Sequence, residues 1–338
     1  MKVCILTEGG RDIGFGHITR CLSLCQAFEA NKISARFIIN GDEAVKDLLK
    51  GRDVEIFDWL KDSERLDDLL EETDIAVVDS YLAGLALYKR IQERAKMAVY
   101  IDDNKRIDYP KGVVLNGTVN ADKKNFFKEE GITHLLGSRY TPLRRDFWEA
   151  PDKEIREIVK SAVITFGGDD SRNITPKVLS LLTKNYPELT KRVIVGKGFK
   201  SLDEINEAKD ENTRLIYHPE ANQMKKVLLE SDIAISAGGQ TLYEAARIGL
   251  PAIAIAVAEN QLDNVRGWLE AGFIEYAGWW EEKGLEENLL KAIERLQKKD
   301  VRLKMSSVGR KFVDGKGSLR VVEALLNTGH PGGLRLRN

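Results

Sequence analysis

Cysteine and histidine are scarce in this chain of 338 residues, which contains three Cys and four His. Cys4, Cys21 and Cys25 are odd in number and lie on apolar faces, so they indicate buried thiols of a cytoplasmic protein rather than a disulfide framework. Pairs of aspartates follow two of the predicted strands, but the histidines have no ligand spacing with them, so no metal site is predicted. The histidines are His17, His134, His218 and His330.

A strong charge of one sign and a long apolar run are also lacking. Lys plus Arg number 52 and Asp plus Glu number 53, so the formal charge of −1 provides no basic field for nucleic acid or an anionic membrane. The longest apolar run, 252–258, has the length of a strand and is too short to span a bilayer. No signal peptide is expected, because the first residues enter a strand at once. We expect a cytoplasmic monomer or weak homodimer, with a charged fraction of 31% that is typical of thermophilic proteins.

Three familiar fingerprints are absent from the sequence. The glycines at 14 and 16 lack the third glycine and the later acidic residue of a dinucleotide-binding loop. Neither a Gly-x-x-x-x-Gly-Lys-Ser/Thr loop nor a Gly-x-Ser-x-Gly nucleophile elbow occurs. These absences disfavour a nicotinamide cofactor, a P-loop site and covalent catalysis, and no cofactor is predicted.

Short apolar runs alternate with amphipathic segments along the chain, which is typical of an α/β protein with a mainly parallel sheet covered by helices. In the first half, strands are expected at 3–6, 35–39, 54–57, 75–78, 98–101 and 113–115, and helices at 18–30, 42–50, 62–72 and 83–96. In the second half, strands are expected at 162–166, 192–195, 213–216, 233–236 and 251–257, and helices at 174–184, 201–208, 221–230, 240–248 and 260–271.

A charged, proline-containing passage at 140–160 marks the junction between the two halves. We expect one Rossmann-like domain at 1–150 and another at 158–327, with a cleft between them. The helical stretch from 285 onward contains a helix able to cross back and brace the first domain. The Gly-rich, basic tail at 328–338 is expected to be disordered.

In such sheets, ligands bind beyond the carboxyl ends of the strands. The loops expected there are rich in Gly, Asp, Asn and Ser, and their meeting point is the candidate site. They are 8–16, 79–82, 102–104, 116–120, 167–171, 237–241 and 258–263.

The first strong motif runs from Gly14 to Cys21, Gly-Phe-Gly-His-Ile-Thr-Arg-Cys, where a glycine loop leads from a strand into a helix. A helix N-terminus carries unpaired N–H groups and partial positive charge, which suit an anion and disfavour an imidazolium. His17, at this helix start, is therefore expected to tend toward the neutral form, as a general base must be, whereas a bound diphosphate would favour the imidazolium. The alternative is that His17 only begins the helix and binds a nearby carbonyl group.

The second strong motif, 236–251, begins where a buried strand ends and a helix follows. Two glycines there let the backbone approach a ligand closely, and free N–H groups, the helix dipole and a hydroxyl suit a phosphate. Glu244 lies one turn further, where its carboxylate can accept two ribose hydroxyls. The alternative is a tight turn followed by a carboxylate that the helix dipole favours. The polar residues of the loop are Ser236, Gly238, Gly239, Gln240 and Thr241.

Three further strand ends carry weaker signals. Gly167 and Gly168 precede two aspartates, which either line the site or cap the next helix. Asp79 and Asp103 each follow an apolar strand, where hydrogen-bonded or solvated carboxylates are favoured over metal ligands.

Taken in order, these motifs resemble the PseG/SpsG family of nucleotide-sugar hydrolases, relatives of the MurG glycosyltransferase with the GT-B fold. The resemblance extends from the first residue to about residue 273. It rests on Gly14-Phe-Gly-His-Ile-Thr-Arg20, Val78-Asp-Ser-Tyr81, Ile101-Asp-Asp103, Leu115-Asn116, Thr165-Phe-Gly-Gly-Asp169, Ile235-Ser-Ala-Gly238, Glu244-Ala245 and Asn260-Gln261.

The resemblance implies a GT-B-like pair of Rossmann-like domains, with UDP held mainly by the second and the reacting sugar by the first. It implies hydrolysis of UDP-2,4-diacetamido-2,4,6-trideoxy-β-L-altropyranose to UDP and the free sugar, in pseudaminic-acid-type surface glycan biosynthesis. Water attacks with inversion and without a metal. By resemblance, His17 is the base, Tyr81 and Asn260 orient the water, the sugar amides or the base, and Glu244 binds the ribose. The other residues expected at the substrate are Gly14, Gly16, Arg20, Asp79, Asp103, Asn116, Gly167, Gly168, Ser236, Gly238, Gly239, Gln240, Thr241 and Gln261.

Two other functions remain open. The loop Ser-Ala-Gly-Gly-Gln-Thr at 236–241 resembles that of glycosyltransferases, which favours a GT-B enzyme with a UDP-sugar donor. A nucleotide-sugar-binding protein without turnover is the remaining alternative, and it predicts UDP binding with no product.

Overall fold

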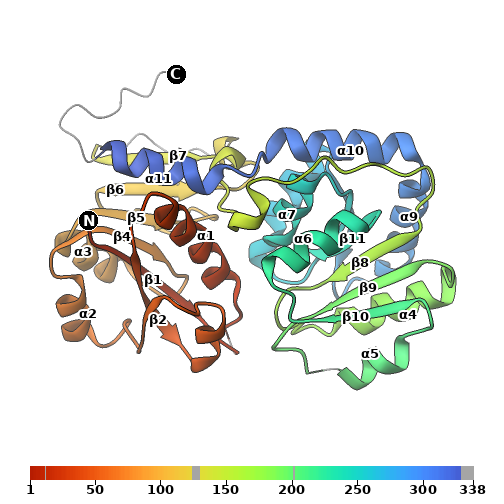
Figure 1. The fold of residues 1–338 in the computed structure, drawn as a ribbon, viewed down its shortest axis with the longest axis horizontal. Helices are drawn as coiled ribbons and strands as arrows, with labels where there is room; N and C mark the ends of the chain where they lie inside the picture. Colours follow the sequence, from red (N-terminus) through yellow and green to blue (C-terminus); the bar gives the residue numbers. More distant parts are fainter. Residues whose placement is uncertain (12, 124–129, 201, 329–338) are drawn as a thin grey trace. The chain divides into compact units, whose positions relative to one another are not determined.

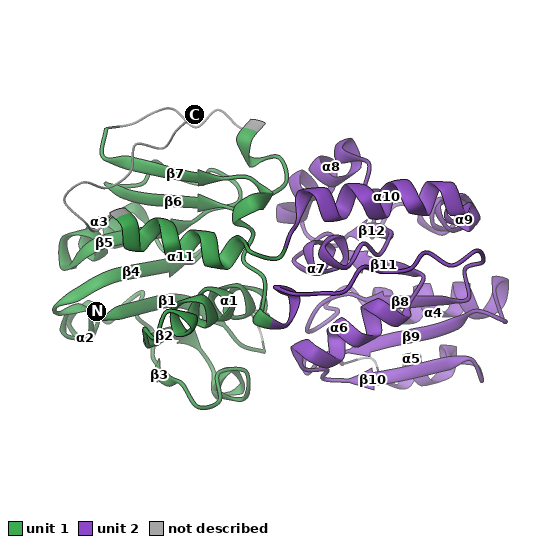
Figure 2. Ribbon diagram, turned by 45° about the horizontal axis from the view of Figure 1, so that its top comes forward, with its two compact units in different colours: residues 1–145, 315–338 green, residues 146–314 purple. Residues whose placement is uncertain are grey.

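The computed structural model describes residues 1–11, 13–123, 130–200 and 202–328. It divides the chain into two compact units, one formed by residues 1–145 and 315–338 and the other by residues 146–314 (Figures 1 and 2). Each unit is a parallel sheet covered by helices, so the predicted α/β class with two Rossmann-like halves is confirmed. Apart from Thr328, the tail expected to be disordered lies outside the described residues.

The sheet of the first unit has seven parallel strands in the order β3-β2-β1-β4-β5-β6-β7. The strands are β1 (Val3–Gly9), β2 (Ala35–Gly41), β3 (Asp53–Ile56), β4 (Thr73–Asp79), β5 (Ala95–Ile101), β6 (Gly112–Asn116) and β7 (Ile132–Leu136). The helices are α1 (Gly16–Ala30), α2 (Ser63–Leu70), α3 (Leu85–Arg94) and α11 (Gly317–Thr328). Cys4 and Leu6 of β1 pack in one core cluster with α2 and α3, whereas α1 and α11 contact each other and cover the opposite face.

The sheet of the second unit has six parallel strands in the order β10-β9-β8-β11-β12-β13. The strands are β8 (Ser161–Thr165), β9 (Thr190–Val195), β10 (Thr213–Tyr217), β11 (Ile233–Ala237), β12 (Ala252–Ala256) and β13 (Ile274–Trp279). The helices are α4 (Ile174–Asn185), α5 (Leu202–Ala208), α6 (Ala221–Glu230), α7 (Thr241–Ile248), α8 (Leu262–Ala271), α9 (Leu285–Gln297) and α10 (Lys299–Phe312). Side chains of α4, α5 and α9 fill the core on one face, and α7 packs against α6 and α10 on the other.

The central strands were predicted because they are buried on both faces and read as continuous apolar runs. Two edge strands were missed: β7 contains His134 and β13 contains Glu275, and both strands are partly exposed. The helix expected at 42–50 is wrong. That segment forms only a short 3₁₀ helix, Glu43–Asp47, which Asp42 caps by accepting a hydrogen bond from Ala44 N at 2.8 Å.

Both sheets change the direction of strand order next to their first strand, between β1 and β4 in one unit and between β8 and β11 in the other. Parallel sheets bind ligands at the carboxyl end of such a switch point. Thr7 pairs with Asp79 in the first unit, so the residues that follow them leave the sheet side by side. The three cysteines are buried free thiols, as predicted. No helix among the described residues has the length and apolar character needed to cross a membrane.

Candidate functional site

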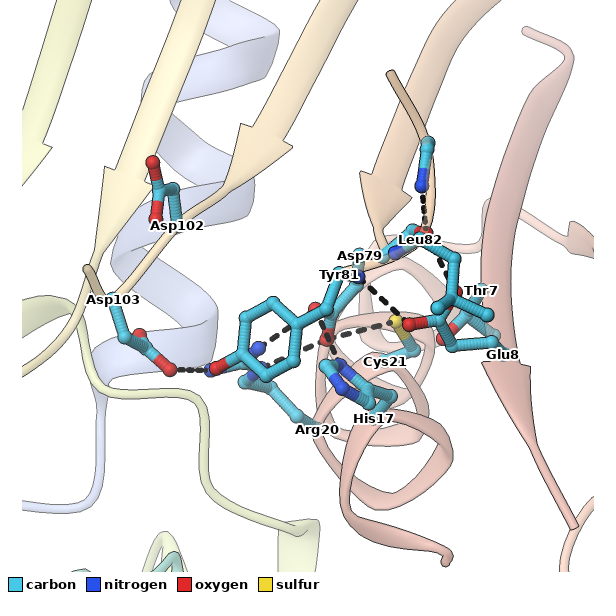
Figure 3. Close-up of polar contacts among 12 residues, drawn as sticks. Thr7, Glu8, His17, Arg20, Cys21, Asp79, Tyr81, Leu82, Asp102 and Asp103 are labelled. Carbon is cyan, nitrogen blue, oxygen red and sulfur yellow. Dashed lines mark hydrogen bonds and ion pairs between the residues drawn. The ribbon is translucent and has the colours of Figure 1, made fainter. Parts of the chain in front are cut away.

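The loops that leave β1 and β4 bring His17 and Asp79 together (Figure 3). His17 lies in the first turn of α1, and Asp79 is the last residue of β4. Their atoms Nδ1 and Oδ1 are 2.8 Å apart. The Asp79 side chain is fully buried, whereas the His17 side chain remains 16% exposed. With Nδ1 bonded to the carboxylate, Nε2 is the ring nitrogen left to exchange a proton.

The glycine loop between β1 and α1 closes on itself ahead of the helix. Gly10 and Gly14 exchange two backbone hydrogen bonds, of 3.0 and 2.8 Å. Gly14 has φ +87°, a conformation that L side chains rarely adopt. A Cβ on Gly14 or Gly16 would meet no heavy atom within 4 Å, so both lie beside open space. The side chain of Phe15 does not cap the helix that follows.

Arg20, one turn further along α1, ties Asp79 to the end of β5. Its Nε and Nη2 donate to Oδ2 and Oδ1 of Asp79 at 2.8 and 2.7 Å, and its Nη1 donates to Asp103. A bidentate arginine and a histidine therefore share one buried carboxylate. Such charge-assisted bonds fix the carboxylate's orientation as well as neutralising it.

The charges of the pair are set by this arrangement. Burial lowers the pKa of His17, but attraction to Asp79 and the hydrogen bond between them raise it more, so its pKa lies above the ordinary value. Burial raises the pKa of Asp79, yet Arg20 and His17 hold it well below its usual range. The prediction that His17 favours the neutral form is therefore wrong in direction. It considered the helix N-terminus and not Asp79, which lies 62 residues away in the chain.

Tyr81 and Glu8 complete this group of residues. The ring of Tyr81 stands edge-on to that of His17, with centroids 4.6 Å apart and planes at 83°. Glu8 is 2% exposed and accepts hydrogen bonds from Ser80 Oγ at 2.6 Å and from Tyr81 N at 2.7 Å. From the sequence, Glu8 is expected in the loop 8–16 and has no assigned role; in the structure it belongs to β1. An acidic residue two positions after the apolar run 3–6 is the signal that could have singled it out.

Asp103 reaches the pair through Arg20, whereas Asp102 and Asn116, at the ends of β5 and β6, bond within their own turns. Asp102 accepts from Asn104 N and Arg106 N at 2.9 and 2.7 Å and so stabilises its own turn. Asn116 is fully buried; its Oδ1 accepts from Thr118, and its Nδ2 has no partner among the described residues. Within the described ranges, no group of three or more His, Cys, Asp or Glu side chains is placed to hold a metal.

In the second unit, the two glycines after β11 have different surroundings. Gly238 N donates to Oε1 of Gln261 at 3.1 Å, and the same oxygen accepts from Val257 N at 3.1 Å. A Cβ on Gly238 would lie 2.5 Å from Cγ2 of Val265, whereas one on Gly239 would meet nothing within 4 Å. The expectation that the N–H of Gly238 faces a phosphate is therefore wrong, since this group already bonds Gln261. Gly239 is the glycine beside open space.

Helix α7 follows directly, with Gln240 as its N-cap residue and no side-chain cap. Thr241 begins the helix, and Glu244 is buried in its first turn. The hydroxyl of Ser236 donates to the carbonyl of Ala237 at 3.0 Å. The start of α7 is thus a helix N-terminus without a capping side chain next to an open glycine, an arrangement that suits an anion.

The remaining predicted residues of the second unit lie on two further loops. Gly167 has φ +85°, and the carbonyl of Gly168 accepts from Gly198 N at 2.9 Å. Asp170 accepts from two N–H groups at the start of α4, at 3.0 and 2.8 Å, so here the capping alternative holds. Asn260 is exposed in the 3₁₀ helix Glu259–Gln261. It belongs to the second unit, whereas His17 and Tyr81 belong to the first.

Comparison with known proteins places this geometry in context. The glycosyltransferase family 28 C-terminal domain matches residues 163–316. The crystal structure of Acinetobacter baumannii MurG matches with a TM-score of 0.68 at 13% identity, over 96% of this chain and 99% of that one. The chain has the GT-B fold.

Three curated relatives are more similar in sequence. The spore coat polysaccharide biosynthesis protein SpsG of Bacillus subtilis is 25% identical over 336 residues, 96% of this chain and 98% of that protein. An uncharacterized protein of Methanocaldococcus jannaschii is 28% identical over 280 residues, 77% of this chain and 57% of that protein. A Helicobacter pylori protein named pseudaminic acid cytidylyltransferase and UDP-2,4-diacetamido-2,4,6-trideoxy-beta-L-altropyranose hydrolase is 24% identical over 265 residues, 78% of this chain. The chain spans about half the length of the last two relatives, 57% and 46%.

Proposed function

We propose that this chain is a cytoplasmic nucleotide-sugar hydrolase that releases UDP from UDP-2,4-diacetamido-2,4,6-trideoxy-β-L-altropyranose or a close relative. The observation that carries the proposal is the His17–Asp79 pair at the switch point of the first unit, with its atoms 2.8 Å apart. Similarity to the Bacillus and Helicobacter proteins supports a role in surface glycan biosynthesis of the pseudaminic acid type.

In the proposed reaction, a water molecule attacks the anomeric carbon on the face opposite to UDP. The new carbon–oxygen bond forms as the bond to the UDP oxygen breaks, and the free sugar has inverted configuration. His17 Nε2 takes the proton that the water loses. Asp79 keeps the other proton on Nδ1 and stabilises the imidazolium that forms. The raised pKa of His17 makes its neutral form a stronger base, and turnover requires a pH above that pKa, because the imidazolium cannot accept the proton of the water.

The second unit is proposed to hold the leaving group. N–H groups at Gly239 and the start of α7 are suited to the diphosphate, whose charge grows as the bond breaks. In this proposal Glu244 binds the ribose, Gln261 fixes the glycine loop, and Asn260 acts with Tyr81 on the water or the sugar. No metal is required in this scheme. The remaining residues proposed to line the substrate are Gly14, Gly16, Arg20, Asp103, Asn116, Gly167, Gly168, Ser236, Gln240 and Thr241.

Product analysis of the purified full chain tests this proposal. The chain is incubated with a panel of UDP-linked diacetamido sugars and other UDP-sugars, with and without a chelator, and products are followed by NMR. We expect release of UDP and a sugar of inverted anomeric configuration from a diacetamido substrate, with or without chelator. No UDP release from any member of the panel, or a retained configuration, contradicts the proposal.

A glycosyltransferase is the second candidate, favoured by the family 28 match and by apolar side chains near the first-unit site. Ile13, Leu82 and Leu85, on the segments that follow β1 and β4, are 44%, 59% and 40% exposed, which suits an apolar acceptor. A transferase releases UDP only when an acceptor is supplied, whereas a hydrolase releases UDP with water alone. A protein that binds UDP but cleaves no UDP-sugar, with or without an acceptor, is neither a hydrolase nor a transferase.

A further inference from the structure

Glu8 is a buried carboxylate next to the His17–Asp79 pair, and the proposed reaction assigns it no step. It lies in β1 one residue after Thr7, which pairs with Asp79 of β4. The residue is 2% exposed. Burying a carboxylate is unfavourable unless hydrogen bonds compensate for the lost water, so the partners of Glu8 indicate what it does.

Both carboxylate oxygens of Glu8 bind the segment that leaves β4. Oε2 accepts from the hydroxyl of Ser80 at 2.6 Å, and Oε1 accepts from Tyr81 N at 2.7 Å. Ser80 Oγ in turn accepts from Leu82 N at 3.1 Å and Ala83 N at 2.9 Å. A hydroxyl has one proton and two lone pairs. Ser80 can therefore accept both N–H groups only while its own proton goes to Glu8.

The segment that Glu8 holds is the one that positions His17. Asp79 binds the imidazole through Oδ1, and two residues later the ring of Tyr81 stands edge-on to it at 4.6 Å (Figure 3). A shift of the backbone at Ser80 and Tyr81 therefore changes the Tyr81–His17 contact directly.

We propose that Glu8 is a positioning residue, whose carboxylate fixes Ser80 and Tyr81 so that Asp79 and Tyr81 hold the His17 ring from two directions. The kinetic consequence rests on the proposed function; the structural consequence does not. Glutamine at this position has the same shape but only one acceptor oxygen. If the amide nitrogen of this glutamine faces Tyr81 N, two donors meet. If it faces Ser80 Oγ, that hydroxyl has a third donor in addition to Leu82 N and Ala83 N.

The kinetic test compares Glu8→Gln with wild type and with Glu64→Gln, which removes a carboxylate from the exposed start of α2. We expect kcat for UDP release to fall about 10- to 100-fold in Glu8→Gln, as small misplacements of catalytic groups do, with UDP affinity unchanged. Glu64→Gln should match wild type.

The negative charge of Glu8 also raises the pKa of His17. A purely electrostatic role would shift the acid limb of the pH profile to lower pH and leave its plateau intact, which would overturn the proposal.

An NMR measurement tests the same claim without turnover. The ring protons of His17 are assigned with His17→Gln, and their ring-current shift from Tyr81 is defined with Tyr81→Leu. In Glu8→Gln this shift should fall toward the Tyr81→Leu value; wild-type shifts would overturn the positioning role even if the enzyme hydrolyses no sugar in the panel. If Glu8→Gln fails to fold, Ser80→Ala removes one of the two hydrogen bonds of Glu8. This variant should lose part of the ring-current shift of His17. An unchanged shift would again overturn the positioning role of Glu8.

Discussion

The two units share the order of six strands but carry different chemistry at the same place on the sheet. In the first unit, the switch point holds His17, Arg20 and Asp79, which bind one another, and Glu8, which binds Ser80 and Tyr81. In the second, it holds glycines, amide side chains and a helix start without a capping side chain. One arrangement suits proton transfer, because its groups are fixed and titratable. The other suits an anion, because backbone N–H groups can approach it closely. The fold provides the positions, and the residues at the strand ends provide the function.

The largest expected effect is that of Asp79→Asn in the first unit. The amide cannot hold the proton on His17 Nδ1 as the carboxylate does, so kcat should fall by about 10³- to 10⁴-fold, as in enzymes where such a carboxylate orients a histidine. Steady-state UDP release measures this change. Asp67→Asn is a matched control, because Asp67 also accepts two bonds from one arginine, Arg90, at 2.8 and 2.9 Å. A fall in kcat of less than about tenfold would show that Asp79 has no part in the reaction.

Next in size is the effect of Gly239→Ala in the second unit. If the open space beside Gly239 holds the diphosphate, a methyl group there should weaken UDP binding about tenfold, or about 1.4 kcal/mol, without lowering thermal stability. Calorimetric titration with UDP provides the measurement. Gly238→Ala is the contrasting variant: its methyl would press against Val265, so the free energy of unfolding should fall by about 1–3 kcal/mol. Unaltered UDP affinity in Gly239→Ala would refute a phosphate site at this loop.

A smaller loss is expected for Arg20→Lys. Lysine keeps the positive charge but not the planar fork that binds Asp79 through two nitrogens and Asp103 through a third. We expect kcat to fall about tenfold, with UDP affinity at the wild-type value, because the fork orients the carboxylate that orients His17. Single-turnover kinetics and UDP titration separate the two quantities. A change in UDP affinity alone would place Arg20 on the nucleotide side instead.

The smallest effect concerns stability and pH. The pKa of His17 is raised above its ordinary 6.5 in the folded chain. Its contribution to stability is therefore fully present below pH 6.5 and is lost as the pH rises through the folded pKa. The difference in free energy of unfolding between wild type and His17→Gln should be larger below pH 6.5 than well above it, as measured by urea denaturation. A difference that grows with pH would mean that burial, and not Asp79, determines the direction in which the pKa of His17 is shifted.

Much of the fold was readable from the sequence because central parallel strands are apolar on both faces. Edge strands gave weaker signals: β7 and β13 are only partly buried and contain His134 and Glu275. The segment 42–50 has helical residues but forms only the 3₁₀ helix Glu43–Asp47, which local spacing alone could not distinguish from an α-helix.

The site was predictable at the level of loops and not of contacts. The sequence placed His17 at the start of the helix after the first strand and Asp79 on a loop at the same sheet edge, but their hydrogen bond depends on the register of β1 against β4. The charge of His17 was therefore predicted from its own helix and came out wrong in direction. The use of the Gly238 N–H by Gln261 likewise joins residues 23 apart, which the loop's composition does not reveal.

The most direct test of the central claim compares UDP release and UDP binding by His17→Gln with those of wild type. If His17 is the base and the second unit binds UDP, the variant should bind UDP with wild-type affinity while kcat falls by about 10²- to 10⁴-fold. Turnover within severalfold of wild type, with the variant correctly folded, would contradict the assignment of His17 as the base.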